Sequence, residues 1–354
     1  MNRIKNILIR QPNWVGDNIF TLPAVQELRR RWPEASLTVL TKPGIVPFWK
    51  LVPEVDRVIA FPFRGGLHDL RKKFLLARKL GRMRFDLAVI FPRSFESALW
   101  AFLAGIRQRW GYREEGRGFL LTRRAVCPQG YRQTHRIDYY FRLLDGGKGG
   151  QPAPAAFISL PEKLGEAAQA ILKKAFPGRG DHPLIGLHPR ASHGPAKCWP
   201  VEHYGALAER LGRELGARIL IFGTAIEAEL NGRVAEAGGA SVLDLTGKTS
   251  LAELAALMAA CDVVVGNDTG PIHLAAATGT SVVALFGSSD PAATAPRGKR
   301  VAVIYRNLPC SPCLRQVCPR DTRCLTEITP GEVFSQVKRF LTERKGRPEE
   351  KTNP

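Results

Sequence analysis

The sequence predicts an α/β protein built from two doubly wound, Rossmann-like domains that face each other across a cleft. Short apolar runs alternate with amphipathic segments along most of the chain. These runs are continuous in Val, Ile and Leu, as expected for parallel strands buried on both faces. The alternation stops at the Gly- and Pro-rich stretch 145-DGGKGGQPAPAA-156 and then restarts, and 354 residues suffice for two domains.

The expected elements follow this alternation. In the first half, strands are predicted over 4–10, 36–41, 57–62 and 86–91, with helices over 18–32, near 66–82, over 94–104 and over 134–147. A helix with Pro at its start is predicted over 161–176. In the second half, strands are predicted over 184–189, 217–223, 241–247, 261–265 and 281–287, with helices over 200–215, 226–237, 250–260, 271–278 and 330–343.

These elements predict the domain organisation. We expect a first Rossmann-like domain at 1–160, a linker region at 161–182, a second Rossmann-like domain at 183–329, a C-terminal helix at 330–344 and a charged tail at 345–354. In sheets of this kind, ligands bind beyond the carboxyl ends of the strands. Residues that directly follow a strand are therefore the candidates for function.

The net charge of +20 is unevenly distributed: residues 1–150 hold 28 Lys and Arg against 12 Asp and Glu, and the remainder holds 24 against 20. This excess predicts a polyanionic partner, which could be nucleic acid, an anionic membrane surface or a phosphorylated substrate. A generally basic, solvated surface is the alternative. The sequence shows neither a membrane-spanning run nor a signal peptide, so a cytoplasmic location is expected.

Four of the seven cysteines cluster as Cys310-x2-Cys313-x4-Cys318-x5-Cys324. We expect reduced structural thiols there, because the spacing is tighter than that of two separated CxxC pairs. A four-thiolate metal site is the alternative. The three scattered cysteines are expected to behave as small buried or half-buried residues: Cys127, Cys198 and Cys261.

Three polar segments directly follow predicted strands. Asp17 lies at the start of the first predicted helix. Two roles are open for it: a carboxylate base, or only the N-cap of the helix. The loop after 184–189 carries donors suited to phosphate oxygens, Ser192 and Lys197 among them. Glu227 follows the next strand, where a carboxylate can accept hydrogen bonds from ribose hydroxyls.

The fourth segment, 266-GNDTGPIHLAAATGT-280, leads from a strand into a helix. Thr269, Gly270 and the following amides stand at the helix N-terminus, and His273 lies one turn in, so the segment is suited to hold a diphosphate. The sequence lacks the G-x-G-x-x-G of dinucleotide enzymes and the H-E-x-x-H of zinc proteases.

Together, these segments resemble the ADP-heptose:lipopolysaccharide heptosyltransferases of glycosyltransferase family 9, and most of all its type II members. The resemblance rests on ILIRQPNWVGDNIFTLPAVQELRRRWP, AKCWP, FGTAIEAE, the block from LTGKTS to FGSSDP, and the CSPC…CP…C cluster. It implies a GT-B fold and an inverting transfer without a catalytic metal. The donor implied is ADP-heptose, and the acceptor is the first inner-core heptose on Kdo2-lipid A.

The resemblance also implies roles. The first domain would bind the acceptor and the second the nucleotide sugar, with the enzyme at the cytoplasmic face of the inner membrane. Asp17 matches the general base, Lys197 the lysine of the donor phosphates and Glu227 the residue near the ribose. The remaining matches lie in the donor site: Ser192, Asp268, Thr269, Gly270 and His273. The nearer alternative is a type I or type III member of the family, which uses a different acceptor. The distant alternative is a basic nucleic-acid-binding protein, although the chain contains no nucleic-acid recognition motif.

Overall fold

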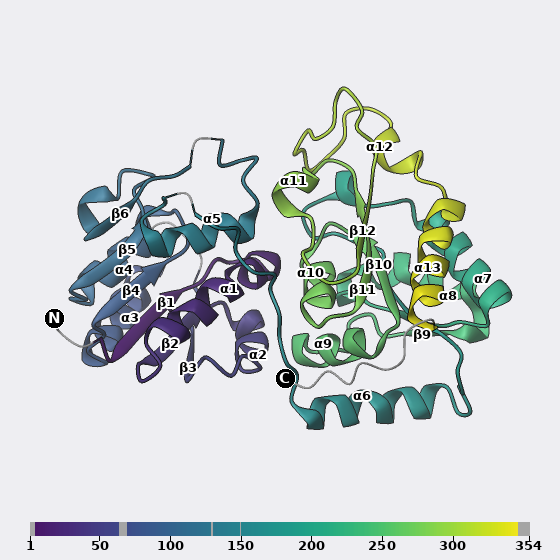
Figure 1. Cartoon of the computed structure of the whole chain (residues 1–354), viewed down its shortest axis with the longest axis horizontal. Helices are drawn as coiled ribbons and strands as arrows, with labels where there is room; N and C mark the ends of the chain where they lie inside the picture. The colour runs from purple at the N-terminus through teal and green to yellow at the C-terminus, as the bar shows by residue number, and fades with distance from the viewer. Residues whose placement is uncertain (1–3, 64–68, 129, 149, 346–354) are drawn as a thin grey trace. The chain divides into compact units, whose positions relative to one another are not determined.

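The computed structural model describes residues 4–63, 69–128, 130–148 and 150–345, and the chain forms two compact units, Met1–Ser159 and Leu160–Pro354. Each unit contains a six-stranded parallel sheet (Figure 1). The predicted α/β class with two doubly wound sheets is therefore confirmed. Residues 66–68 of one predicted helix, and the predicted tail from residue 346, lie outside the described residues.

The sheet of the first unit has the strand order β3-β2-β1-β4-β5-β6. All of its pairings are parallel. Ile7 of β1 is aligned with Leu37 of β2 on one side and with Leu87 of β4 on the other. Because the strand order reverses between β1 and β4, the carboxyl ends of these two strands flank the expected ligand position. The strands are β1 (Asn6–Arg10), β2 (Ser36–Thr41), β3 (Arg57–Ala60), β4 (Leu87–Ile90), β5 (Gln108–Tyr112) and β6 (Arg123–Ala125).

Helices cover both faces of this sheet, since every residue of β4 is buried. One face is covered by α3, α4 and η2, whose Leu76, Trp100 and Leu120 pack with Leu8 and Ala88 of the strands. The opposite face carries α1 and α5, which contact each other. The helices of the unit are α1 (Val15–Arg31), η1 (Pro43–Ile45), α2 (Val46–Trp49), α3 (Leu70–Arg82), α4 (Phe95–Leu103), η2 (Gly118–Leu120), α5 (Arg136–Arg142) and η3 (Leu143–Asp145).

The second unit repeats the topology with the order β12-β11-β10-β7-β8-β9, so its strand order reverses between β7 and β10. Its central strands are buried throughout, from Leu184 to His188 and from Val263 to Asn267. The strands are β7 (Leu184–His188), β8 (Arg218–Ile221), β9 (Val242–Asp244), β10 (Val263–Asn267), β11 (Ser281–Phe286) and β12 (Val301–Tyr305).

Two helical layers enclose this sheet. Leu211 of α7, Val234 of α8 and Val337 of α13 pack on one face. Leu172 of α6, Leu257 of α9 and Ile272 of α10 pack on the other. The helices are α6 (Glu162–Ala175), η4 (Pro195–Lys197), α7 (Val201–Leu215), η5 (Ala225–Glu227), α8 (Ala228–Gly238), η6 (Gly239–Ser241), α9 (Leu251–Ala260), α10 (Gly270–Ala277), α11 (Pro291–Thr294), α12 (Arg323–Thr326) and α13 (Pro330–Lys345).

Three strands were not predicted: β5, β6 and β12. They lie at or next to the sheet edges, and most of their residues are only partly buried. An edge strand such as β6 has one open side and can carry charged residues such as Arg123 and Arg124, so no apolar run marks it. None of the helices described here is long and apolar enough to cross a bilayer.

Candidate active site

The donor-site candidates lie at the carboxyl ends of three adjacent strands of the second unit. Lys197 follows β7, Asp268 follows β10 and Glu227 follows β8, and the sheet places these strands in the order β10-β7-β8. Parallel pairing puts all three carboxyl ends at the same edge of the sheet. Residues separated by up to 71 positions are thus brought to one edge around the strand-order reversal.

Asp268 is the centre of a buried polar cluster. Its Oδ2 lies 2.7 Å from the Nζ of Lys197, and its Oδ1 lies 3.3 Å from the Nε2 of His273. The hydroxyl of Thr294, in the last turn of α11, donates to the same Oδ2 at 3.3 Å. The structure therefore brings three of the predicted donor residues into direct contact and adds Thr294.

The cluster keeps Asp268 ionised. Burial alone would raise the pKa of this carboxyl, but the hydrogen bond from His273 and the charge of Lys197 outweigh burial and hold its pKa well below the usual range. The side chain of Lys197 is also largely buried, with 17% exposed. Its ammonium is consequently held in one place instead of moving freely in solvent.

Asn267, the last residue of β10, fixes the loop that carries Lys197. Its Oδ1 accepts from the backbone N–H of Trp199 at 2.9 Å, and its Nδ2 donates to the carbonyl of Pro189 at 2.8 Å. Because Asn267 is fully buried, these bonds join both ends of the 189–199 loop to the central strand. Asn267 was not predicted, although it directly precedes the predicted Asp268.

The N-terminus of α10 provides an anion-binding edge beside this cluster. Thr269 is the N-cap, and the helix begins with Gly270 and Pro271. The first N–H groups of a helix lack intrahelical acceptors and carry a partial positive charge. Within the part of the chain that the structure describes, the buried hydroxyl of Thr269 has no hydrogen-bond partner.

Ser288 and Ser289, which follow β11 after Gly287, also have hydroxyls without a hydrogen-bond partner among the described residues. Both side chains are buried. Buried hydroxyls are normally satisfied, so these groups are available to a ligand. The sequence could have indicated these serines, because Ser288 and Ser289 directly follow the predicted strand 281–287.

Ser192 and Glu227 share a second, shallow pocket of about 300 Å³, together with Arg190, Thr224 and Ile226. Glu227 is half-buried, and its Oε2 accepts from the N–H of Thr224 at 2.7 Å in a capping box. The carboxylate thus has a structural role in the turn after β8. The side chain of Ile226 is 96% exposed and gives this pocket an apolar surface.

Asp17 belongs to the first unit and lies in the first turn of α1. The interpretation of Asp17 as an N-cap is wrong, because the helix begins at Val15 and Trp14 is the N-cap. The Oδ1 of Asp17 accepts a hydrogen bond of 3.0 Å from the hydroxyl of Tyr140. Burial and the neighbouring charge of Asp17 raise the pKa of Tyr140, so this phenol stays protonated and can donate.

Tyr140, the partner of Asp17, was not predicted from the sequence, and neither was the buried environment of Arg10. Tyr140 lies on α5, which contacts α1 although the two residues are 123 positions apart, so no local pattern marks it. Arg10 ends β1 and is buried, with its guanidinium 4.1 Å from the ring centre of Phe61. Burial lowers the pKa of Arg10 to about 9, partly opposed by the charge of Glu96.

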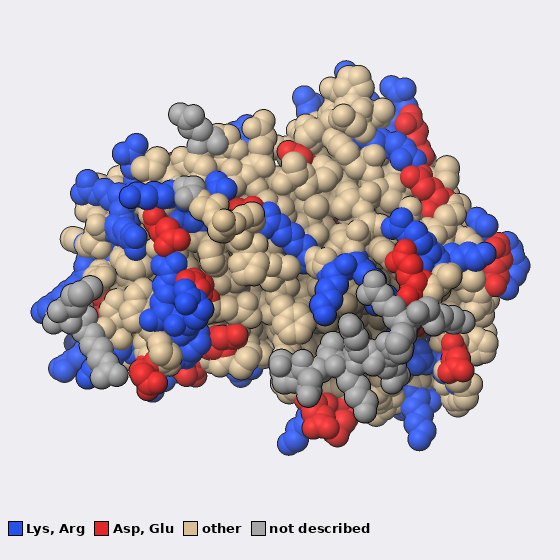
Figure 2. Space-filling view, viewed as in Figure 1, with Lys and Arg blue, Asp and Glu red and all other residues tan. Residues whose placement is uncertain are grey.

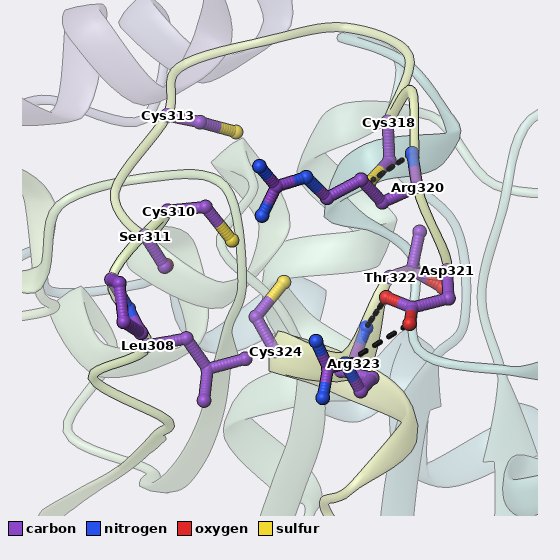
Figure 3. A pocket seen from close by; sticks show the side chains of 11 residues that line it. Leu308, Cys310, Ser311, Cys313, Cys318, Arg320, Asp321, Thr322, Arg323 and Cys324 are labelled. Atoms are coloured by element: carbon purple, nitrogen blue, oxygen red, sulfur yellow. Dashed lines mark hydrogen bonds and ion pairs between the residues drawn. The ribbon is translucent and has the colours of Figure 1, made fainter.

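The four clustered cysteines line one cavity of about 310 Å³ between β12 and α12. All four are free thiols, and Figure 3 shows the guanidinium of Arg320 extending among them. Burial raises the pKa of Cys324 to about 11, with a further contribution from the other three thiols. Among the described residues, no three His, Cys, Asp or Glu side chains form a group that could hold a metal ion.

The segment from Cys310 to Cys324, here called the cysteine loop, also contacts the candidate donor site. The backbone N–H of Ala196 donates to the carbonyl of Gln316 at 3.1 Å. Gly194 approaches the same carbonyl so closely that a Cβ atom there would lie 2.4 Å from its oxygen. Gln316 lies between Cys313 and Cys318, so the cysteine loop packs directly on the loop that carries Lys197.

Comparisons with known proteins agree with this geometry. A family model described as glycosyltransferase family 9 (heptosyltransferase) matches residues 74–323. Lipopolysaccharide heptosyltransferase 2 of Salmonella typhimurium is 31% identical over 348 residues, which cover 95% of this chain and 99% of that protein. Lipopolysaccharide heptosyltransferase 2 of Escherichia coli is 33% identical over 306 residues, covering 84% of this chain and 87% of that protein.

A solved structure has the same architecture over its full length. The ADP-heptose lipopolysaccharide heptosyltransferase II of Escherichia coli superposes with a TM-score of 0.82 at 29% identity, covering 96% of this chain and all of the other. Two Rossmann-like units in one chain form the GT-B architecture that the resemblance implied. The chain belongs to glycosyltransferase family 9, the heptosyltransferases.

Proposed function

We propose that this chain is an inverting heptosyltransferase that moves L-glycero-D-manno-heptose from ADP-heptose to the first heptose of the lipopolysaccharide inner core. The observation that carries the proposal is the similarity to a type 2 heptosyltransferase along 95% of the chain. The buried Lys197–Asp268–His273 cluster at a helix N-terminus supports it, because such a site suits a departing diphosphate.

The second unit binds the donor in this proposal. Lys197 and the N–H groups of Thr269 and Gly270 neutralise the diphosphate, and His273 adds a donor one turn into α10. Asp268 holds Lys197 in place and accepts hydrogen bonds from the heptose hydroxyls. Ser192 and Glu227 contact the nucleoside from their shared pocket, which is supported by the apolar surface of Ile226 beside them.

The first unit supplies the base. Asp17 takes the proton of the acceptor hydroxyl while that oxygen attacks the anomeric carbon, and the bond to the diphosphate breaks with inversion. The electron pair leaves with ADP, whose developing charge the cations and amides of the second unit stabilise. The hydrogen bond from Tyr140 supports this role, because it fixes the orientation of the Asp17 carboxylate.

We place this reaction at the cytoplasmic face of the inner membrane, with the protein bound peripherally. Its acceptor, heptosyl-Kdo2-lipid A, is lipid-anchored and carries carboxylates and phosphates. The basic excess of residues 1–150 is complementary to such an acceptor. On the face drawn in Figure 2, Lys and Arg side chains form several patches on the first unit, among uncharged residues and fewer Asp and Glu.

The experiment that tests the function is a transfer assay with purified protein, ADP-heptose and two defined acceptors, with and without the first heptose. We expect a product only from the acceptor that carries the first heptose. Transfer to the acceptor that ends in Kdo would indicate type I specificity instead. Failure to transfer heptose to either acceptor, with the donor intact, would contradict the proposal.

A further inference from the structure

We propose that the outer sides of α3, α4 and η2 form a docking surface for an anionic phospholipid bilayer. This inference rests on the proposed function, which places the acceptor in a membrane. It identifies the surface of the first unit that would bind that membrane. We call it the aromatic-basic face. It consists of four exposed phenylalanines with flanking arginines; the phenylalanines are Phe74, Phe95, Phe102 and Phe119.

The three elements present their outer sides in the same direction. Leu76 of α3, Trp100 of α4 and Leu120 of η2 all pack in one core layer on the same face of the sheet. Residues on the far side of these elements therefore lie on one side of the unit. The rings of Phe95 and Phe119 are 6.0 Å apart, so α4 and η2 are continuous at the surface.

The aromatic rings of this face are exposed to solvent. The four phenylalanines are between 40% and 67% exposed, and Leu75 and Leu103 are both 52% exposed. On α4, the exposed positions Phe95, Phe102 and Leu103 follow helical spacing and include no charged residue. Apolar groups gathered on one surface generally mark an interaction site.

The charges around these rings select an anionic partner. The sequence of α3 contains six Lys and Arg and no Asp or Glu. Arg71, Arg78 and Arg82 are exposed and share a face of the helix with Phe74, at spacings of three, four and eight residues. The guanidinium of Arg109 lies 5.4 Å from the ring centre of Phe102.

The acidic residues of these helices do not oppose this charge. Glu96 forms an ion pair of 2.7 Å with the buried Lys73, which joins α4 to α3. Asp69 is paired with Lys72 at 2.8 Å. Aromatic and leucine side chains flanked by exposed arginines, for which no ion pair with another described residue is found, match the chemistry of a bilayer interface, where rings enter the acyl boundary and cations contact lipid phosphates.

The test measures vesicle binding by sedimentation with the full chain. The vesicles contain either phosphatidylethanolamine with phosphatidylglycerol or phosphatidylcholine alone. We expect binding to the anionic vesicles only, weakening as salt rises. Binding should fall about ten-fold or more in an aromatic variant (Phe74→Ser, Phe102→Ser, Phe119→Ser) and in a charge variant (Arg71→Glu, Arg78→Glu, Arg82→Glu).

Matched controls change equally exposed residues elsewhere. The charge control reverses three exposed lysines of α6, and the aromatic control replaces exposed apolar residues outside the face. Both should bind vesicles as the unmodified chain does, and circular dichroism verifies that all variants fold. The substitutions are Lys163→Glu, Lys173→Glu and Lys174→Glu for the first control, and Phe157→Ser, Val303→Ser and Val317→Ser for the second.

A second readout separates this proposal from the proposed function. With a soluble, deacylated acceptor, the face variants should turn over at the unmodified rate, and they should lose activity only when the acceptor is embedded in vesicles. Unchanged vesicle binding by both face variants, or equal binding to phosphatidylcholine, would overturn the docking surface whatever the transfer assay gives. Dimerisation through these phenylalanines without vesicle binding, seen by light scattering, would also overturn it.

Discussion

Asp17 is a residue whose position in the chain was predictable but whose immediate partner was not. A carboxylate soon after the first strand follows from the sequence, since β1 ends at Arg10 and α1 begins at Val15. The hydrogen bond from Tyr140 depends on the packing of α5 against α1. Tertiary contact thus turns a helix-start carboxylate into an oriented group.

If Asp17 is the base, Asp17→Asn should lower kcat by about 10²–10⁴-fold, because the amide cannot accept the acceptor proton. The dissociation constant for ADP should remain within about two-fold, because the proposed nucleotide contacts lie in the second unit. Steady-state kinetics and calorimetric titration measure the two quantities. Full activity in the variant would exclude Asp17 as the base.

Asp268 should make a pH-dependent contribution to stability. Its pKa is lowered on folding, so its contribution is fully present above the unfolded pKa of about 3.9 and is lost as the pH falls below that value. At pH 7, Asp268→Asn should lower the free energy of unfolding by roughly 2–4 kcal/mol, because Lys197 loses its buried partner. Denaturant unfolding at pH 7 and at acidic pH measures the difference between variant and unmodified protein.

The difference between the two proteins should shrink as the pH falls below about 4. A difference that stays constant from pH 7 into the acid range would mean that Asp268 is not stabilised as a carboxylate. Thr294→Val is a useful companion variant, because it removes the hydrogen bond from the hydroxyl of Thr294 to Asp268 while the ion pair with Lys197 remains. Its destabilisation should be about 1 kcal/mol.

Among the elements, the candidate donor site includes the 189–199 loop, which lies between a strand and a second loop. Asn267 fastens the ends of the 189–199 loop, and Gln316 of the cysteine loop supports its middle. Gly194 has a φ of +145° and meets the Gln316 carbonyl where no side chain fits. The sequence shows the glycine but not the close approach that requires it.

Gly194→Ala should therefore displace the 189–199 loop. Lys197 would move with it, because its backbone N–H donates to the carbonyl of Gly194 at 3.2 Å. We expect a loss of about 1–3 kcal/mol in stability and weaker ADP binding. Gly232→Ala is the matched control, since nothing lies within 4 Å of the added methyl in α8. Equal stability and ADP affinity in both variants would show that the Gly194 contact is dispensable.

The cysteine cluster makes a separate prediction for this loop. We expect purified protein to contain less than about one tenth of an equivalent of zinc or iron, and EDTA to leave turnover unchanged, because in the proposed mechanism Lys197 and helix amides assist diphosphate departure. Elemental analysis and an EDTA-treated transfer assay measure this. If the purified protein contains one equivalent of metal and a Cys310→Ser, Cys313→Ser variant contains none, the cluster is a four-thiolate metal site. The free-thiol interpretation would then be wrong.

At the scale of the whole molecule, each unit has its own sheet and its own enclosing helices, and the proposed roles divide between the units accordingly. The donor candidates all follow strands of the second sheet, whereas Asp17 follows the first strand of the first sheet. The excess of basic charge belongs to the first unit. Binding of a nucleotide should therefore stabilise one unit selectively.

Calorimetry should show this selectivity. ADP at 100 times its dissociation constant should stabilise the transition of the second unit by about 2.7 kcal/mol, whereas single-stranded DNA at moderate salt should not. In Lys197→Ala, the stabilisation by ADP should fall while that by adenosine persists, because only ADP presents phosphates. Equal losses for both ligands would contradict a phosphate contact of Lys197.

Residue patterns alone were enough to predict the two doubly wound sheets, their central strands and the segments that follow them, because buried parallel strands require continuous apolar runs and ligands bind where those runs end. The motifs of family 9 were also recognisable in the chain. The folded molecule was needed to reveal the edge strands, the Asp268–Lys197 ion pair, the contact of Tyr140 with Asp17 and the aromatic-basic face. These features depend on strand order and helix packing between distant residues, which leave no periodic pattern in the chain.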